Sequence, residues 1–265
     1  MQEPTAPSRV HLISTRILCD TEGRGYATPE NRSPLEIVLD ASEGFVPLWA
    51  EGVTLRWRFQ ERSLQALDDL EGTRAAITDL LAAALLAWGP AVPVRFVHDP
   101  RNWDFEIVAR RFDDCTPSGC VLASAFFPDG GRHQLIVYPR MFQQSRQEQI
   151  ETIAHELGHV FGLRHFFAAL HESAWPSEVF GVHQRFTIMN YGPDSRLTDD
   201  DRSDLANLYD LVWSGRLTAI NGTPVRLVLP FTALGGAAPV TTAPVVAAAV
   251  RSGCGCGPAS GPRFV

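Results

Sequence analysis

The 265-residue sequence predicts a protein of the α+β class, and three observations support this. Apolar and polar residues alternate over 53–60, which is the pattern of a half-buried strand. Apolar residues over 77–88 instead follow helical spacing, and this pattern stops at Gly89 and a proline. The predicted elements follow in the order strand, helix, strands, helix, loop and helix, which favours one α+β domain over 51–215.

The strands of this domain are expected to form one sheet. The first strand lies at residues 52–60, and a helix begins near Thr73 and ends at Trp88. Further strand-like runs follow, separated by clusters of Pro, Gly and Asp. They occupy residues 92–98, 104–110, 121–127 and 134–138. A sheet of about five strands is therefore predicted.

Two further helices have recognisable starts. Ser145 is followed three residues later by Glu148, which is the pattern of a capping box. Thr198 is the expected N-cap of the last helix, and acidic residues in its first turn favour the positive end of the helix dipole. Each helix carries an apolar stripe, formed by Ile150, Ile153, Ala154, Leu157 and Phe161 in one and by Leu205, Leu208, Tyr209 and Val212 in the other.

Regularity fades outside residues 51–215. Residues 1–50 are interpreted as an N-terminal extension, and residues 216–265 as a C-terminal extension, rich in Ala, Gly and Pro, that is largely flexible. Cys115 and Cys120 enclose the turn-forming string Thr-Pro-Ser-Gly, which favours a small disulfide-closed loop over two free thiols.

Charge and composition exclude several partners. The chain has 23 basic and 30 acidic residues, and its net charge is −7. The basic residues are scattered, so we expect no nucleic-acid partner. The uncharged run at 227–250 is broken by Pro and Gly, so no membrane span is expected. The N-terminus lacks the apolar core of a secretory signal, which leaves localisation open between export by another route, a removed signal and an intracellular protein.

The segment HELGHVFGLRH, residues 155–165, has the spacing of metal ligands. Residues four apart lie on one face of a helix, so His155 and His159 can direct their rings at one ion. A catalytic zinc takes three protein ligands and keeps one open position, so the third ligand must come from outside that face. Gly162 accepts the left-handed conformation that ends a helix, which lets His165 turn back toward the ion. One catalytic Zn²⁺ is therefore predicted.

Glu156 lies next to a ligand but about 100° round the helix, so it can face the water at the open position. This is the place of a general base that deprotonates a zinc-activated water for attack on an amide carbonyl. A bare HExxH pattern occurs by chance with some frequency. The five fixed positions found here have an expected chance occurrence of roughly 10⁻⁵ to 10⁻⁴ in such a chain, which favours the metal interpretation.

The full pattern HExxHxxGxxH, followed by TIMNYG at residues 187–192, resembles the signature of the metzincin metallopeptidases. The resemblance implies a metzincin-like catalytic domain with a twisted mixed sheet of about five strands, an active-site helix, a Met-turn and a C-terminal helix. It also implies that Met189 lies beneath the zinc and that Tyr191 approaches the metal and stabilises the oxyanion. On its own, the segment TIMNYG would more often form an ordinary turn beside the core.

Within the metzincins, the sequence is most similar to the matrixins. VLASAFFP at residues 121–128 is similar to their edge-strand motif, and LTDDDRSDLANLYD at residues 197–210 is similar to their last helix. The resemblance implies that the edge strand pairs its free backbone groups with an extended polypeptide substrate. The residues it assigns to this strand are Leu122, Ala123, Ser124 and Ala125.

The sequence also departs from the matrixin pattern. Phe166 follows the third histidine, where matrixins have serine or threonine. Only His133 and the more distant His98 are present where a second, structural zinc would need several ligands, so no such site is predicted. The Cys115–Cys120 loop is a candidate substitute clamp. Calcium could bind the aspartates of this region, although a solvated loop is the favoured interpretation; these are Asp113, Asp114 and Asp129.

The extension over residues 1–50 could hold the enzyme latent, as matrixin pro-segments do with a cysteine thiolate. Cys19 is the candidate thiol there, and Asp20 could coordinate instead. A buried structural cysteine is the alternative interpretation. Deleting residues 1 to about 45 is expected to raise activity if either residue blocks the zinc.

The sequence therefore predicts a zinc-dependent metalloendopeptidase that acts on polypeptides. Two other functions remain open: a zinc-bearing binding protein that has lost turnover, and a zinc hydrolase acting on a non-peptide amide. An intact Glu156 argues against the first, and the edge-strand motif argues against the second. Neither the oligomeric state nor the physiological substrate follows from the sequence.

Overall fold

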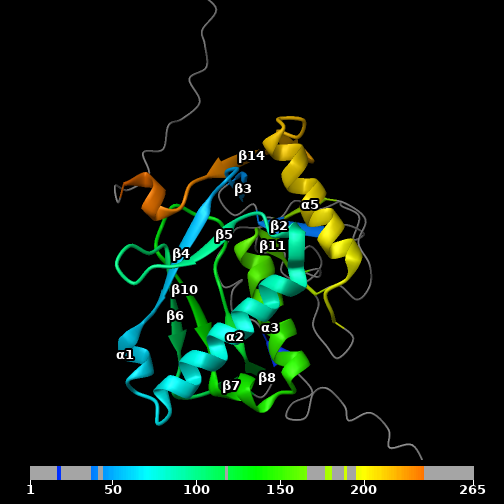
Figure 1. The fold of residues 1–265 in the computed structure, drawn as a ribbon. Coiled ribbons are helices and arrows are strands. Elements are labelled where there is room, and N and C mark those ends of the chain that lie inside the picture. The colour runs from blue at the N-terminus through cyan, green and yellow to red at the C-terminus, as the bar shows by residue number, and fades with distance from the viewer. Residues whose placement is uncertain are drawn as a thin grey trace, which may run out of the picture.

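This computed structural model describes residues 17–18, 37–40, 44–116, 119–165, 177–180, 188–189 and 195–235 (Figure 1). The helices are α1 Glu61–Leu64, α2 Leu70–Trp88, α3 Arg146–Val160 and α5 Asp199–Trp213, with 3-10 turns η1 Gly89–Ala91, η2 Pro139–Gln143 and η3 Phe231–Leu234. The strands are β1 Ile17–Leu18, β2 Ile37–Asp40, β3 Val46–Trp49, β4 Thr54–Phe59, β5 Arg95–His98, β6 Phe105–Ala109, β7 Asp114–Thr116, β8 Gly119–Val121, β9 Ala123–Ser124, β10 His133–Val137, β11 Leu163–Arg164, β12 Ser177–Phe180, β13 Ala219–Ile220 and β14 Thr223–Val228.

The largest sheet has five strands in the order β5-β4-β6-β10-β9. Strands β5, β4, β6 and β10 pair in parallel, whereas β9 pairs antiparallel with β10. The α+β class and the mixed sheet of about five strands are thereby confirmed. Strand β9 ends the order and contacts α3, so the edge of the sheet lies beside the helix that carries two of the predicted ligands.

Local sequence explains the first strand and helix of this core. Burial alternates along β4, because its apolar side chains face the core and its polar side chains face outward. Helix α2 begins where the Asp69 side chain accepts a hydrogen bond from the backbone N–H of Gly72 at 2.9 Å. It ends where Gly89 has a φ of 59°, a value that favours glycine.

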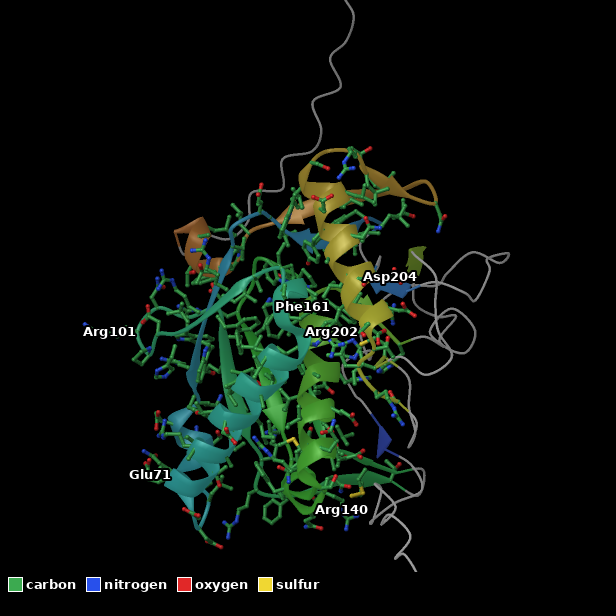
Figure 2. All side chains as sticks on the ribbon, turned by 45° about the vertical axis from the view of Figure 1, so that its right-hand side comes forward. Glu71, Arg101, Arg140, Phe161, Arg202 and Asp204 are labelled. Carbon is green, nitrogen blue, oxygen red and sulfur yellow. A yellow bond between two sulfur atoms is a disulfide. The ribbon has the colours of Figure 1, made fainter. Side chains whose placement is uncertain are left out.

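Helices α2 and α3 pack against each other across one face of the sheet (Figure 1). The buried indole of Trp88 on α2 donates to the carbonyl of Ala154 on α3 at 2.9 Å. Ser145 caps the start of α3 by accepting from the N–H of Glu148 at 3.2 Å, as its position predicts. Figure 2 shows Phe161, just after α3, inside the molecule, whereas Glu71 and Arg101 point outward.

Three small sheets connect segments that are distant in the sequence. Their orders are β1-β8-β7, β11-β2-β12 and β13-β14-β3. In the last of these, β14 from the C-terminal part of the chain pairs in parallel with β3. Described strands also lie on both sides of the 51–215 range that the order of predicted elements indicated. Before it, β3 contains fully buried residues, and after it, Ile220 of β13 is buried. Residues 236–265 and most of 1–43 lie outside the described residues.

The β7-β8 hairpin carries the cysteine pair singled out in the sequence. Cys115 and Cys120 stand opposite each other in its register and form a disulfide. Arg140 reaches this bridge, with Nη1 at 3.1 Å from Sγ of Cys120.

No helix in the described part of the chain is both long and apolar enough to cross a membrane.

Candidate metal centre

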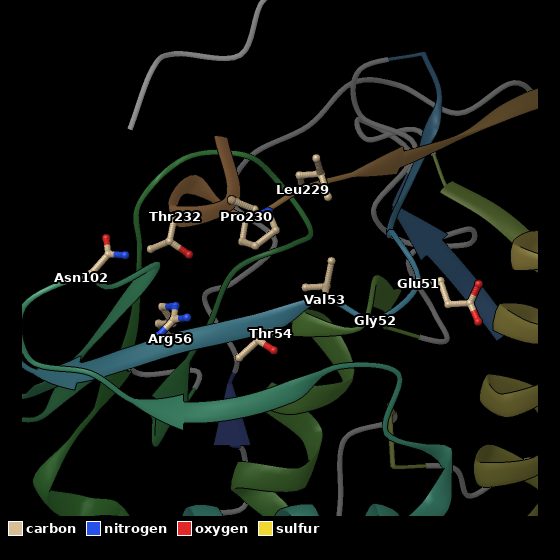
Figure 3. Close-up of a pocket in the computed structure, with 10 residues that line it drawn as sticks. Glu51, Gly52, Val53, Thr54, Arg56, Asn102, Leu229, Pro230 and Thr232 are labelled. Carbon is tan, nitrogen blue, oxygen red and sulfur yellow. The ribbon is translucent and has the colours of Figure 1, made fainter. Parts of the chain in front are cut away.

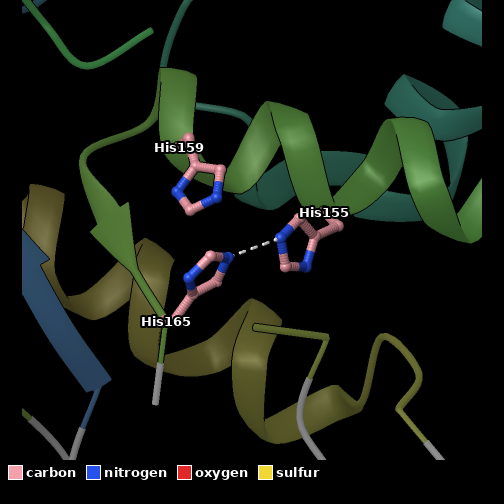
Figure 4. A group of neighbouring side chains, drawn as sticks. All are labelled: His155, His159 and His165. Carbon is pink, nitrogen blue, oxygen red and sulfur yellow. Dashed lines mark hydrogen bonds between the residues drawn. The ribbon is translucent and has the colours of Figure 1, made fainter. Parts of the chain in front are cut away.

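Three histidine side chains converge at the end of α3 (Figure 4). His155 and His159 lie one turn apart on the helix, and His165 comes directly after β11. Their candidate ligand atoms all lie within 4.8 Å of one another, and Nε2 of His155 is 3.1 Å from Nε2 of His165. His159 and His165 are fully buried, and His155 is 8% exposed. Among the described residues, these histidines are the one group of three or more ligating side chains that could hold a metal ion.

The donor atoms, and the spacing of one pair of them, fit a zinc ion. Zinc–nitrogen bonds of roughly 2.0 to 2.1 Å in a tetrahedron place two ligand nitrogens about 3.3 Å apart. The 3.1 Å between His155 and His165 is close to that spacing. Neutral imidazoles are common ligands of zinc and of several other transition metals, so the donor set indicates a metal of this class.

Backbone carbonyls fix the orientation of two rings. Nδ1 of His155 lies 2.7 Å from the carbonyl oxygen of Ile188, and Nδ1 of His159 lies 2.7 Å from that of Leu163. A carbonyl oxygen only accepts, so each Nδ1 must carry a proton and donate it. The lone pair of the neutral ring is then on Nε2, which faces the shared centre. This is the outer-shell arrangement typical of metal-bound histidine.

Gly162 makes the turn that brings the third histidine back. Its φ of 95° lies in the left-handed region, and its N–H donates to the carbonyl of His159 at 2.8 Å. A Cβ at this position would stand 3.0 Å from Cδ2 of Leu48 and 3.3 Å from the carbonyl oxygen of Pro47. Both the backbone conformation and the close approach of β3 therefore require glycine here.

Met189 lies against α3 at Gly158, the residue before His159. It is 2% exposed, and its Sδ lies 2.5 Å from where a Cβ of Gly158 would be. The metzincin resemblance implied a place beneath the metal for this methionine, and Met189 contacts the helix that carries two of the three histidines.

The turn at Ile188 and Met189 is connected to the start of α5. Asp201 accepts from the N–H of Thr198 at 2.8 Å and from the N–H of Ile188 at 3.4 Å. Thr198 accepts in return from the N–H of Asp201, which completes a capping box. Burial raises the pKa of Asp201, and the hydrogen bonds from Thr198 and Ile188 oppose that rise. Asp201 therefore connects the start of α5 to Ile188, whose carbonyl orients His155.

The proposed general base lies on α3, and the proposed substrate strand contacts this helix. Glu156 follows His155 on α3 and is 2% exposed. Of the proposed substrate strand, Ala123 and Ser124 form β9, and the carbonyl of Leu122 accepts from the N–H of Tyr138 at 3.0 Å. Ala125 follows the strand and is half-buried. Tyr191, Cys19 and Asp20 lie outside the described residues.

The side chains considered for a structural zinc or for calcium do not join the histidine group. Asp113 accepts from the N–H of Arg140 at 2.7 Å, and Asp129 lies 3.7 Å from His133. The ring of His133 stacks on Phe126 with 4.4 Å between centroids. His98 packs on Trp57 and Asp114 is exposed in β7, so neither belongs to the histidine group.

Sequence reasoning missed two residues that support the centre. The indole of Trp49 on β3 donates to the carbonyl of Val160 at 2.7 Å, at the end of α3. No local pattern marks this tryptophan as part of the site. Asp201 carried a usable signal, because a threonine followed three residues later by an acidic residue is a capping pattern, but the pattern does not say what else the carboxylate binds.

No protein-family model matches the sequence. No curated protein matches it either. Among solved structures, the fold is similar to that of myroilysin, with 12% sequence identity over 65% of this chain and 98% of that chain, and with a TM-score of 0.43. A likeness at this level says nothing about chemistry, which depends on the side chains of the site itself.

Proposed function

We propose that the protein is a zinc-dependent metalloendopeptidase of the metzincin type, most like a matrixin. The observation that carries this proposal is the convergence of His155, His159 and His165, with two of the three rings held by backbone carbonyls so that Nε2 faces the centre. Three neutral imidazoles leave one position of a tetrahedral ion open, which is the arrangement of catalytic and not of structural zinc sites.

Glu156 is the proposed general base. A zinc ion, when bound, supplies a water of lowered pKa and a positive charge that polarises the substrate carbonyl. Glu156 takes the proton from the attacking water and returns it to the leaving amine. Its burial at 2% exposure keeps bulk water from competing for that proton. Tyr191 is proposed to stabilise the oxyanion, as the metzincin resemblance implies.

The proposed substrate is a polypeptide in extended conformation. Strand β9 ends the five-stranded order and contacts α3, which carries the proposed base and two proposed ligands. A peptide that adds to residues 122–125 by backbone hydrogen bonds would lie beside the histidines. Such pairing recognises the peptide backbone, which supports an endopeptidase over a hydrolase of non-peptide amides.

The test compares wild type, Glu156→Ala and Glu151→Ala for zinc content and for cleavage of a peptide library. Glu151 is the matched control, because it is a half-buried acid on the same helix and bonds Gln147. We expect all three proteins to bind one zinc and Glu156→Ala alone to lose roughly two to four orders of magnitude in rate. Retained cleavage by Glu156→Ala would defeat the mechanism. Zinc binding without cleavage by wild type would support a silent binding protein instead.

A further inference from the structure

The segment from Ala219 to Leu234, here called the C-terminal clasp, runs from the end of α5 back to the five-stranded sheet (Figure 1). Its strand β14 pairs in parallel with β3, so that Val228 stands beside Trp49. The N–H of Ala50 extends this ladder by donating to the carbonyl of Val228 at 3.0 Å. The clasp therefore supplies the strand to which β3 is hydrogen-bonded in this sheet.

The far end of the clasp is fastened by a buried carboxylate. Asp104, 2% exposed, accepts from the N–H of Thr232 at 2.7 Å and from its hydroxyl at 3.2 Å. The same carboxylate accepts from the N–H of Arg56, in β4, at 2.7 Å. Hydrogen bonds to a buried charged acceptor are among the strong ones. The side chain of Asp104, directly before β6, thus ties the clasp to β4.

Stacking adds to this attachment. The guanidinium of Arg132 lies 4.4 Å from the ring centroid of Trp103 and 4.3 Å from that of Phe231, in the clasp. Pro230 and Thr232 line a cleft of about 300 Å³ together with Thr54 and Arg56 of β4. Figure 3 shows the two pairs on opposite sides of it. The clasp is therefore fixed at its end and hydrogen-bonded along β14.

Trp49, the last residue of β3, forms hydrogen bonds at the end of α3. Its indole N–H donates to the carbonyl of Val160 at 2.7 Å, and its backbone N–H donates to the hydroxyl of Tyr209 at 3.4 Å. That hydroxyl in turn donates to the carbonyl of Phe161 at 3.1 Å. The last carbonyls of a helix have no partner within it, so these bonds fix how α3 ends. The turn at Gly162 follows immediately.

We propose that the C-terminal clasp is a positioning element for the third histidine. It holds β3 against the end of α3, and β3 in turn fixes the turn at Gly162 from which His165 returns to the other two rings. Neighbouring atoms of β3 lie 3.0 and 3.3 Å from a Cβ built at Gly162, so a shift of β3 acts on this turn directly. The inference rests on the proposed function, because it concerns the ligand of the same metal.

The first experiment compares the full chain with a chain ending at residue 235 and one ending at residue 218. Zinc affinity is measured by competition with a chromophoric chelator, and backbone order by amide hydrogen exchange over residues 158–165. We expect the chain ending at 218 to lose about tenfold or more in zinc affinity, which is the size of outer-shell effects, and to exchange faster at the turn. The chain ending at 235 keeps the clasp and should stay within twofold of the full chain. An unchanged affinity in the chain ending at 218 would overturn the proposal.

A second variant covers the case in which the shorter chain does not fold. Trp49→Phe keeps a buried ring but removes the bond to Val160, and we expect weaker zinc binding and faster exchange at 161–165. Trp88→Phe is the matched control, because it removes an indole bond to Ala154 of the same helix, keeps an aromatic ring beside Phe161 and leaves the bond from Trp49 to Val160 intact. If both variants lower zinc affinity equally, Trp49 acts only on general stability and the proposal fails.

The design separates this proposal from the proposed function. If wild type binds no zinc or cleaves no peptide in a Glu156-dependent way, the proposed function fails. Hydrogen exchange of the metal-free proteins still reports whether the clasp orders the turn at Gly162. If wild type binds zinc and cleaves peptides but the clasp variants match it, only the positioning role is rejected.

Discussion

Met189 and Gly158 are in such close contact that a Cβ on the glycine would stand 2.5 Å from the methionine sulfur. Gly158 lies in α3, directly before His159 and three residues after His155. The carbonyl of Ile188, next to Met189, orients the ring of His155. A single short turn therefore contacts the histidine helix at its backbone and at a ligand.

This contact predicts the effect of Gly158→Ala. The added methyl group forces the buried side chain of Met189 to shift, which should cost about 1 to 3 kcal/mol of stability, less the roughly 1 kcal/mol that alanine gains over glycine in a helix, and weaken zinc binding. Thermal unfolding and chelator competition measure the two effects. Met189→Ala removes the clashing sulfur, so the double variant should lose less than the sum of the single variants. Strict additivity would show that the two residues do not act on each other.

The hydrogen bonds of Asp201 predict that Asp201→Asn weakens zinc binding. The substitution keeps one oxygen acceptor but removes the charge that strengthens the hydrogen bonds from Thr198 and Ile188, so the connection between α5 and the turn that orients His155 is weakened. We expect roughly a tenfold loss of zinc affinity, typical for an outer-shell partner. Asp200→Asn is the control, because Asp200 is exposed in the same helical turn. Equal affinities for the two variants would contradict the role of Asp201.

Glu148 gives the protein a pH-dependent stability. Burial, followed by repulsion from Glu151, raises the pKa of Glu148 from 4.5 to about 7. The folded protein therefore holds this proton more tightly than the unfolded chain, and stability falls as pH rises from about 4.5 to about 7. Glu148→Gln removes this pH-dependent loss of stability. At pH 8 the melting temperature of the variant should therefore exceed that of wild type by roughly a few degrees, and near pH 4.5 the two should be equal. The exposed substitution Glu51→Gln should leave the pH profile of wild type unchanged.

Zinc should stabilise the folded protein, because the three rings converge only in the fold. We expect added zinc to raise the melting temperature of chelator-treated protein, and His165→Ala to abolish most of this rise. Ligand imidazoles must be neutral, so the zinc-dependent rise should shrink as pH drops below about 6. Calorimetry across pH measures it. A rise of equal size in His165→Ala would mean that the metal binds elsewhere.

The latency hypothesis predicts that removal of Cys19 or Asp20 raises the rate per bound zinc. Strand β2 pairs with β11 directly before His165, so a deletion through residue 45 would also remove a strand next to the ligand. A deletion ending at residue 35, together with Cys19→Ala and Asp20→Ala in the full chain, avoids this effect. Peptide cleavage normalised to zinc content is the measurement. An unchanged rate in all three proteins would remove the hypothesis.

Sequence alone determined the parts of this protein that depend on near neighbours. The 3.6-residue period placed His155 and His159 on one face of α3, and Ser145 and Thr198 marked the starts of α3 and α5. Alternation identified β4, and glycine at 162 indicated the turn before His165. Each of these features rests on backbone geometry and hydrogen bonds within a few residues.

Tertiary structure decided the rest. The bond from Trp49 to Val160 joins residues 111 positions apart, and no local pattern indicates which strand will meet the end of a helix. The same holds for β14, which pairs with β3 although composition suggested a flexible extension, and for the carbonyl of Ile188 that orients His155. A residue's type and position in the sequence determine which hydrogen-bonding atoms it has. Which distant residue pairs with those atoms is determined only when the whole chain packs.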